Sequence, residues 1–153
     1  MTIKKGHEIE LDIDRTAHHG AGVARKDGFV VFVRGGVPGD RVRARIFRKK
    51  RDYAEAAVME VLTASPARTR PPCPYAGVCG GCQWQHIRYP SQVVYKRSHI
   101  QDALERIGGL TGVPVRETLP SELVFGYRNK MEFSFSDRRL SLIHISEPTR
   151  LRR

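Results

Sequence analysis

The sequence lacks any long apolar run, and only three of its 153 residues are cysteines. A membrane-spanning helix needs about 20 predominantly apolar residues, and no segment approaches that length. The first residues are charged but are not followed by the apolar stretch of a secretion signal. We therefore expect a cytoplasmic protein, with no membrane partner, and a monomer.

The cysteines are odd in number and lie close together, at Cys73, Cys79 and Cys82. Disulfides are rare in cytosolic proteins, whereas closely spaced cysteines often bind a metal. The spacing therefore favours a metal site over disulfide bonds.

Acidic residues are scarce relative to basic ones. The chain has 27 lysines and arginines against 16 aspartates and glutamates, which gives a formal charge of +11 and a pI near 10.1. Such an excess is typical of proteins that bind a polyanion, most often a nucleic acid. The alternative is a basic surface with no such partner.

Residues 140–153 do not continue the pattern before them. They resemble a translated sequencing-adaptor peptide, and the alternating, strand-like residues 131–136 stop without turn residues. We expect an artefactual tail and exclude it from the fold. A natural carboxyl-terminal tail is the alternative, and the basic excess remains either way.

Five short segments before residue 63 have strand character. Residues 8–14 alternate between apolar and acidic side chains, and Asp27-Gly28 is a strong hairpin signal. The expected strands are 8–14, 23–25, 29–34, 41–48 and 53–62, although residues 54–57 could also begin a helix. Short strands with glycine-rich turns predict a small, mainly β barrel of the OB type over residues 1–63.

Residues 41–48 are the most informative of these strands. A period of two places Val42, Ala44 and Ile46 inside the barrel. The opposite face then carries the predicted RNA-binding side chains, which are continued by two lysines: Arg41, Arg43, Arg45, Phe47, Lys49 and Lys50. Arginines around an aromatic ring suit phosphates and a stacked base. Alternatively, the arginines pair with the acidic side chains of residues 8–14.

The cysteine loop, residues 73–87, follows a basic linker at 64–72. Its three thiolates are one ligand short of the four that structural zinc sites and four-iron clusters normally use. The fourth ligand is either His86, which would complete a zinc site, or a cysteine beyond residue 139. Spacing alone does not decide between them.

Residues 88–110 are predicted to contain one amphipathic helix, from Ser91 to Ile107, with Ser91 as its cap and Gly108-Gly109 as its end. The apolar stripe comprises Val93, Ile100, Leu104 and Ile107, and His99 beside it is interpreted as structural. Residues 111–139 are predicted to be the incomplete start of a central β domain: a loop over 110–125, then a strand over 127–136.

Two known families resemble this chain. Residues 20–25 and 32–44, with Gly20-Ala-Gly22 and Val37-Pro-Gly-Asp40, are similar to the TRAM domain, an RNA-binding barrel. A dinucleotide loop at Gly20 is rejected because its third glycine is missing. The cysteine loop, together with residues 89–96 and 127–133, resembles the RNA (uracil-5-)-methyltransferase family. The methylthiotransferases also carry this barrel, but they differ from this chain in the spacing of their cysteines and in having the barrel last.

The resemblance implies the amino-terminal part of an S-adenosylmethionine-dependent RNA uridine C5-methyltransferase. It implies that Cys73, Cys79 and Cys82 hold a 4Fe-4S cluster whose fourth ligand lies downstream. In such enzymes a cysteine thiolate adds to C6 of the uracil before C5 is methylated. The catalytic α/β domain is absent here, and no catalytic or cofactor-binding residue can be assigned, so we expect this chain to be inactive.

The implied partner is RNA, and we favour 23S ribosomal RNA over transfer RNA. The alternative function is a stand-alone RNA-binding barrel with a zinc site formed by three cysteines and His86.

Overall fold

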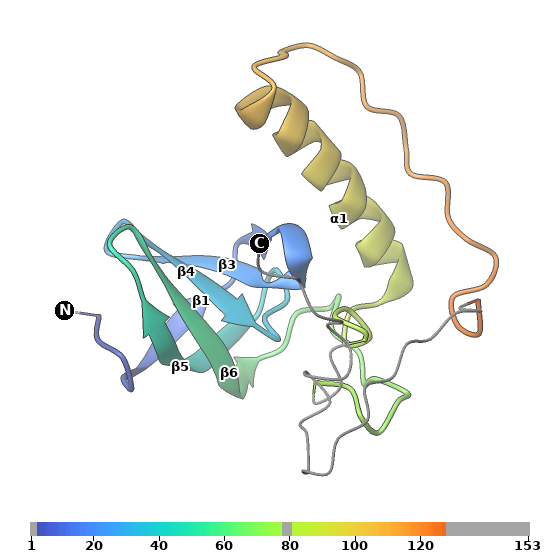
Figure 1. Ribbon diagram of the computed structural model, residues 1–153. Coiled ribbons are helices and arrows are strands. Elements are labelled where there is room, and N and C mark those ends of the chain that lie inside the picture. Colours follow the sequence, from blue (N-terminus) through green and yellow to red (C-terminus); the bar gives the residue numbers. More distant parts are fainter. Residues whose placement is uncertain (1–2, 78–80, 128–153) are drawn as a thin grey trace, which may run out of the picture.

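The computed structural model describes residues 3–77 and 81–127. Its main body is a six-stranded sheet, and a long helix stands beside it (Figure 1). The strands are β1 (Glu8–Asp12), β2 (Arg15–Thr16), β3 (Gly22–Lys26), β4 (Phe29–Arg34), β5 (Arg41–Lys49) and β6 (Tyr53–Thr63).

The sheet closes into a barrel because residues 8–16, which form β1 and β2, pair at both edges of the sheet. The strand order is β1-β5-β6-β4-β3-β2. β1 pairs with β5, and β2, which follows β1 after two residues, pairs with β3 at the opposite edge. The predicted barrel is therefore confirmed as a mainly β fold, and full closure leaves few unpaired strand edges.

Two local predictions for this region are resolved by the structure. Asp27 and Gly28 both have positive φ, 51° and 79°, as the tight turn between β3 and β4 requires. Residues 54–57 lie within β6, so the helical alternative for them is wrong. Alternate β6 side chains pack into the barrel, and the segment pairs with both β4 and β5. Those sheet contacts outweigh the helical propensity of its alanines.

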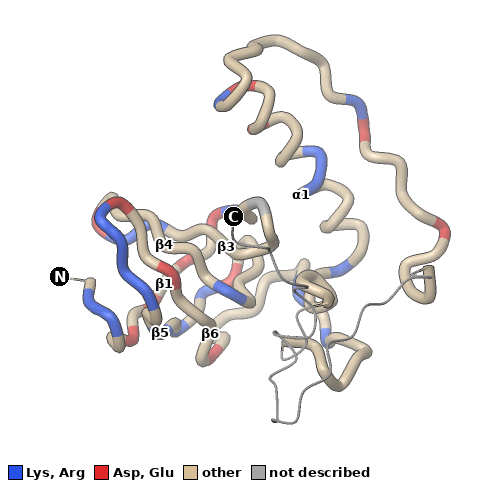
Figure 2. Tube along the Cα trace, in the orientation of Figure 1, with Lys and Arg blue, Asp and Glu red and all other residues tan. Residues whose placement is uncertain are grey.

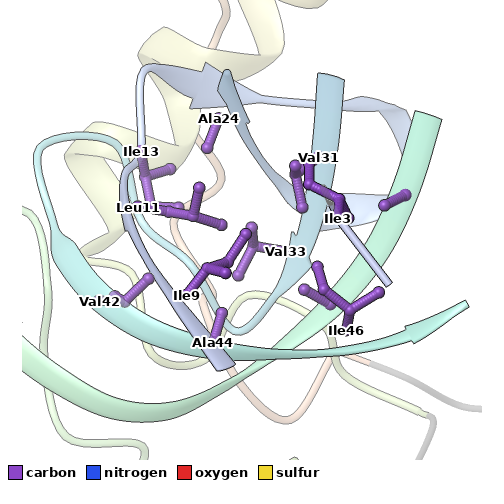
Figure 3. Close-up of a cluster of buried hydrophobic side chains, with 12 residues drawn as sticks. Ile3, Ile9, Leu11, Ile13, Ala24, Val31, Val33, Val42, Ala44 and Ile46 are labelled. Atoms are coloured by element: carbon purple, nitrogen blue, oxygen red, sulfur yellow. The ribbon is translucent and has the colours of Figure 1, made fainter. Parts of the chain in front are cut away.

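The core is filled by the apolar side of every strand except β2 (Figure 3). In β1 the alternation predicted from the sequence is confirmed, since Ile9 and Leu11 are buried and the acidic residues between them are exposed. The other core side chains come mainly from β4, β5 and β6: Val31, Val33, Val42, Ala44, Ile46, Ala54 and Ala56. Small side chains on β6 suit the narrow interior of a six-stranded barrel.

Helix α1 (Tyr89–Asp102) continues through a wider turn, η2 (Ala103–Ile107), and ends at Gly108. It starts two residues before the predicted position, and Ser91 is not its cap. Pro90 occupies the first turn, where a missing N–H is tolerated and the fixed φ already suits a helix.

The predicted apolar stripe does not form a packed face. Ile100 and Ile107 are 55% and 87% exposed, and none of the described residues of α1 or η2 is buried. The helix contacts the barrel through polar atoms, with His99 Nε2 2.8 Å from the Thr16 hydroxyl. This supports the interpretation of His99 as a structural residue.

Residues 110–125 are irregular, as expected. The predicted strand at 127–136, apart from its first residue, and the proposed tail at 140–153 lie outside the described residues. Within the described part of the chain, no helix is long and apolar enough to cross a bilayer.

Candidate nucleic-acid interface and cysteine loop

The predicted arginine face exists, but its charges are paired. Arg41, Arg43 and Arg45 all project outward from β5. Their guanidinium groups contact glutamates of the strands on either side, with the shortest separations 3.1 Å for Arg41–Glu10, 2.6 Å for Arg43–Glu60 and 2.6 Å for Arg45–Glu8. The alternative of cross-strand ion pairs is therefore confirmed. Such exposed pairs contribute roughly 0–1 kcal/mol each, but they reduce the net positive field of this face.

Phe47 lies at the end of that row, where β5 contains a bulge. The register with β6 shifts between Ile46 and Arg48, and Phe47 is the extra residue. Arg34, from β4, extends over the Phe47 ring with its guanidinium carbon 4.6 Å from the ring centre. Sequence reasoning missed Arg34, because its neighbour across the sheet is set by a parallel pairing that no local pattern reveals.

The turn between β5 and β6 is strongly basic (Figure 2). Lys49, Lys50 and Arg51 are exposed, and no described carboxylate lies within salt-bridge distance of them. The Lys49 ammonium lies 5.9 Å from the centre of the Phe29 ring. The two predicted lysines therefore belong to an exposed basic turn rather than to the paired arginine face.

A buried ion pair fixes the linker to the barrel. The Asp40 carboxylate is fully buried and accepts hydrogen bonds from the backbone N–H groups of Val37 at 2.7 Å and Ser65 at 2.9 Å. Arg68 contacts the same carboxylate at 2.5 Å and donates to the Gly35 carbonyl at 2.6 Å. Burial alone would raise the pKa of Asp40, but these hydrogen bonds and the charge of Arg68 lower it.

The cysteine loop begins directly after this clamp. Cys73 is half-buried, Cys82 is exposed, both are free thiols, and Cys79 lies outside the described residues. The Cys73 backbone N–H donates to the Gln85 side chain at 3.4 Å. Free thiols on a loop held at both ends match, in kind, the donor set of an iron–sulfur or zinc site. The described residues contain no group of three metal-binding side chains.

Trp84 anchors the loop between the barrel and the helix. Its ring lies 5.6 Å from His99 and 6.3 Å from Tyr95, and it packs so closely on Gly20 that a Cβ there would be 2.6 Å from the indole nitrogen. The positive φ of Gly20 and this contact explain a glycine that is not part of a dinucleotide loop. The indole N–H is buried without a partner among the described residues.

His86 lies in the same loop and is half-buried, with its Nε2 atom shielded from solvent. Desolvation, and then the nearby charge of Arg68, lower its pKa, so the imidazole is neutral at pH 7. Its Nε2 has no hydrogen-bond partner among the described residues. A neutral imidazole is the form that binds a metal. The structure therefore leaves His86 chemically able to act as a ligand.

Comparison with known proteins agrees with this arrangement. The TRAM domain family matches residues 3–59. A protein of Halalkalibacterium halodurans named as an uncharacterized RNA methyltransferase is 40% identical over 92% of this chain and 31% of its own length. One of Synechocystis sp. with the same description is 46% identical over 87% of this chain and 29% of its own.

Among solved structures, a tRNA (uracil-54, C5)-methyltransferase of Pyrococcus abyssi, in complex with S-adenosyl-L-homocysteine, superposes with a TM-score of 0.52. It is 26% identical, and the match covers 82% of this chain and 27% of that protein. The chain thus carries a TRAM domain match over residues 3–59, is similar to proteins named RNA methyltransferases, and spans about 30% of the length of the relatives it matches.

Proposed function

We propose that this chain is the RNA-binding, amino-terminal part of an S-adenosylmethionine-dependent RNA uridine C5-methyltransferase. The observation that carries the proposal is continuous similarity to RNA methyltransferases over about nine-tenths of the chain, through both the barrel and the cysteine loop. The uracil-C5 chemistry and the cofactor are supported by the archaeal tRNA enzyme whose structure superposes on it.

The barrel supplies RNA affinity and orientation in this proposal, and the chemistry belongs to residues outside the chain. The described residues contain no strand followed by a glycine-rich loop and a helix, the usual arrangement of a nucleotide-cofactor site. We therefore propose that the chain by itself transfers no methyl group. We also propose 23S ribosomal RNA as the target, with transfer RNA as the competing substrate.

The test is methyl transfer from labelled S-adenosylmethionine to unmodified RNA, using the protein encoded at the source locus. The proposal predicts 5-methyluridine in 23S ribosomal RNA with that protein and none with the 153-residue chain. Methylation at another atom, or none with the protein of the whole locus, would refute it.

We further propose that Cys73, Cys79 and Cys82 bind a 4Fe-4S cluster, which would hold the loop and the adjoining linker in one conformation. The competing function is an RNA-binding barrel with a zinc site completed by His86, supported by the neutral imidazole and its unpartnered Nε2. Metal analysis of the protein encoded at the source locus, purified without oxygen, distinguishes the cluster from the zinc site. Iron and sulfide support the cluster, whereas one equivalent of zinc, lost in a His86→Ala variant, supports the zinc site.

A further inference from the structure

We propose that Arg34 and Phe47 form a stacking platform for an unpaired nucleobase of single-stranded RNA, and that Lys49 and Lys50 contact the adjoining phosphates. This rests on the proposed RNA-binding function and adds to it the surface and the form of RNA that is recognised. It moves the centre of the interface from the β5 arginines to the outer face of β4.

Charge is the first argument. Four outward-facing arginines of β5 each have a glutamate partner, with the following shortest contacts: Arg41–Glu10, Arg43–Glu60, Arg45–Glu8 and Arg48–Glu55. Arg34 is exposed on the same outer surface, and no described carboxylate lies within salt-bridge distance of it. An RNA phosphate or base can therefore approach Arg34 without displacing a glutamate.

The geometry of the sheet is the second argument. Ala57 of β6 is the register partner of Arg34 on one side and of Arg45 on the other. Because alanine has only a Cβ, the Arg34 side chain has room to cross it and reach Phe47 at 4.6 Å. Phe47 is the extra residue of a bulge, and bulges commonly redirect a side chain at functional positions.

The Arg34 guanidinium lies over the Phe47 ring, and Arg34 is exposed. Nucleobases stack on guanidinium planes and on aromatic rings, so this pair offers an unpaired base a partner at the surface. Phe32, two residues before Arg34 on the same face, packs edge-to-face on Tyr53 with ring centres 5.5 Å apart. These half-buried rings extend the aromatic surface from Arg34 toward the basic turn.

That basic turn supplies the phosphate contacts. The backbone N–H of Lys50 donates to the Tyr53 carbonyl at 2.8 Å, which fixes the turn directly beside the aromatic surface. A strand of RNA stacked on the platform thus continues past exposed lysines. Bases within a duplex already stack on each other and cannot use such a platform, so the arrangement selects single strands.

The test compares charge-conserving variants of the 153-residue chain in fluorescence anisotropy with a short labelled oligouridylate. Arg34→Lys keeps the charge and removes the planar group, and Arg41→Lys makes the same change at an ion-paired arginine. We expect about ten-fold weaker binding for Arg34→Lys, with the wild-type salt dependence, and little change for Arg41→Lys. Phe47→Leu removes the ring from the outer face, leaves the barrel core unchanged and should weaken binding similarly. Circular dichroism establishes that each variant is folded.

The outcomes separate this inference from the proposed function. Wild-type binding that is equal for the oligouridylate and a hairpin duplex of the same length overturns the single-strand inference. Unchanged binding by Arg34→Lys and Phe47→Leu, with loss in Arg41→Lys, moves the site back to the β5 arginines and leaves RNA binding standing. No binding to any RNA at low salt would contradict both the stacking platform and the proposed RNA-binding function.

Discussion

Asp40 and Arg68 connect the barrel, the loop before β5 and the start of the cysteine segment through one buried carboxylate. We predict that Arg68→Ala lowers the free energy of unfolding by about 3 kcal/mol, because it leaves a buried charge without its partner. Arg70→Ala, an exposed change in the same linker, should stay within about 0.5 kcal/mol of the wild type. Urea unfolding measures both, and equal values for the two variants would contradict the account.

The same carboxylate predicts a pH dependence. The folded-state pKa of Asp40 is lowered, so its stabilising contribution is present above about pH 4, the unfolded value, and is lost as the pH falls through the folded value. The difference in unfolding free energy between the wild type and Asp40→Asn should therefore shrink as the pH falls below about 4. A difference that stays constant down to about pH 2 would show that the charge of Asp40 does not contribute.

At this scale the sequence predicted which side chains point outward, and offered pairing of the β5 arginines with the acidic residues of β1 as one alternative, but it did not predict the contacts of Asp40 and Arg34. Alternation correctly placed Arg41 and Phe47 on the outer face. The partners of Asp40 and Arg34 come from segments distant in the sequence, and the parallel β4–β6 pairing brings Arg34 across from Ala57. Only the folded sheet determines such contacts.

Gly20 decides how the cysteine loop packs on the barrel. An added Cβ there would lie 2.6 Å from the indole nitrogen of Trp84, and the φ of 81° disfavours any L side chain. Gly28 is a matched control, with a φ of 79° and nothing within 4 Å of an added Cβ.

We predict that Gly20→Ala and Gly28→Ala both lose about 1 kcal/mol from the left-handed backbone, and that Gly20→Ala loses more because Trp84 must move. Trp84 is the only tryptophan in the sequence, so its fluorescence reports this contact directly. The emission maximum should change in Gly20→Ala and not in Gly28→Ala. Identical spectra for the two variants would mean that Trp84 does not depend on Gly20.

Elements with strong local signals were predicted well. The β3–β4 hairpin follows from Asp27-Gly28, and β1 follows from its alternation. The start of α1 was misplaced because Ser91 has the chemistry of a cap, while Pro90 is equally suited to a first turn. The apolar spacing along α1 predicted a face that needs a partner and is left exposed in this chain, and nothing among the described residues covers Ile100 or Ile107.

At the scale of the whole molecule, the net charge of +11 is unevenly distributed. Ion pairs reduce the net charge along β5, whereas Lys49, Lys50 and Arg51 remain exposed at one end of the barrel. Total charge therefore indicates a polyanionic partner but does not locate it. The resemblance to RNA methyltransferases was recognisable from the sequence because the barrel and the cysteine loop occur together and in order.

The proposed function is tested most directly by measuring 5-methyluridine in 23S ribosomal RNA from the source organism before and after deletion of the gene. We predict the loss of this nucleoside at one or more positions, restored by the gene of the whole locus and not by codons 1–139 alone. An unchanged 5-methyluridine content in both ribosomal and transfer RNA would contradict the assignment to a uridine C5-methyltransferase. Loss confined to transfer RNA would keep the chemistry and refute the ribosomal target.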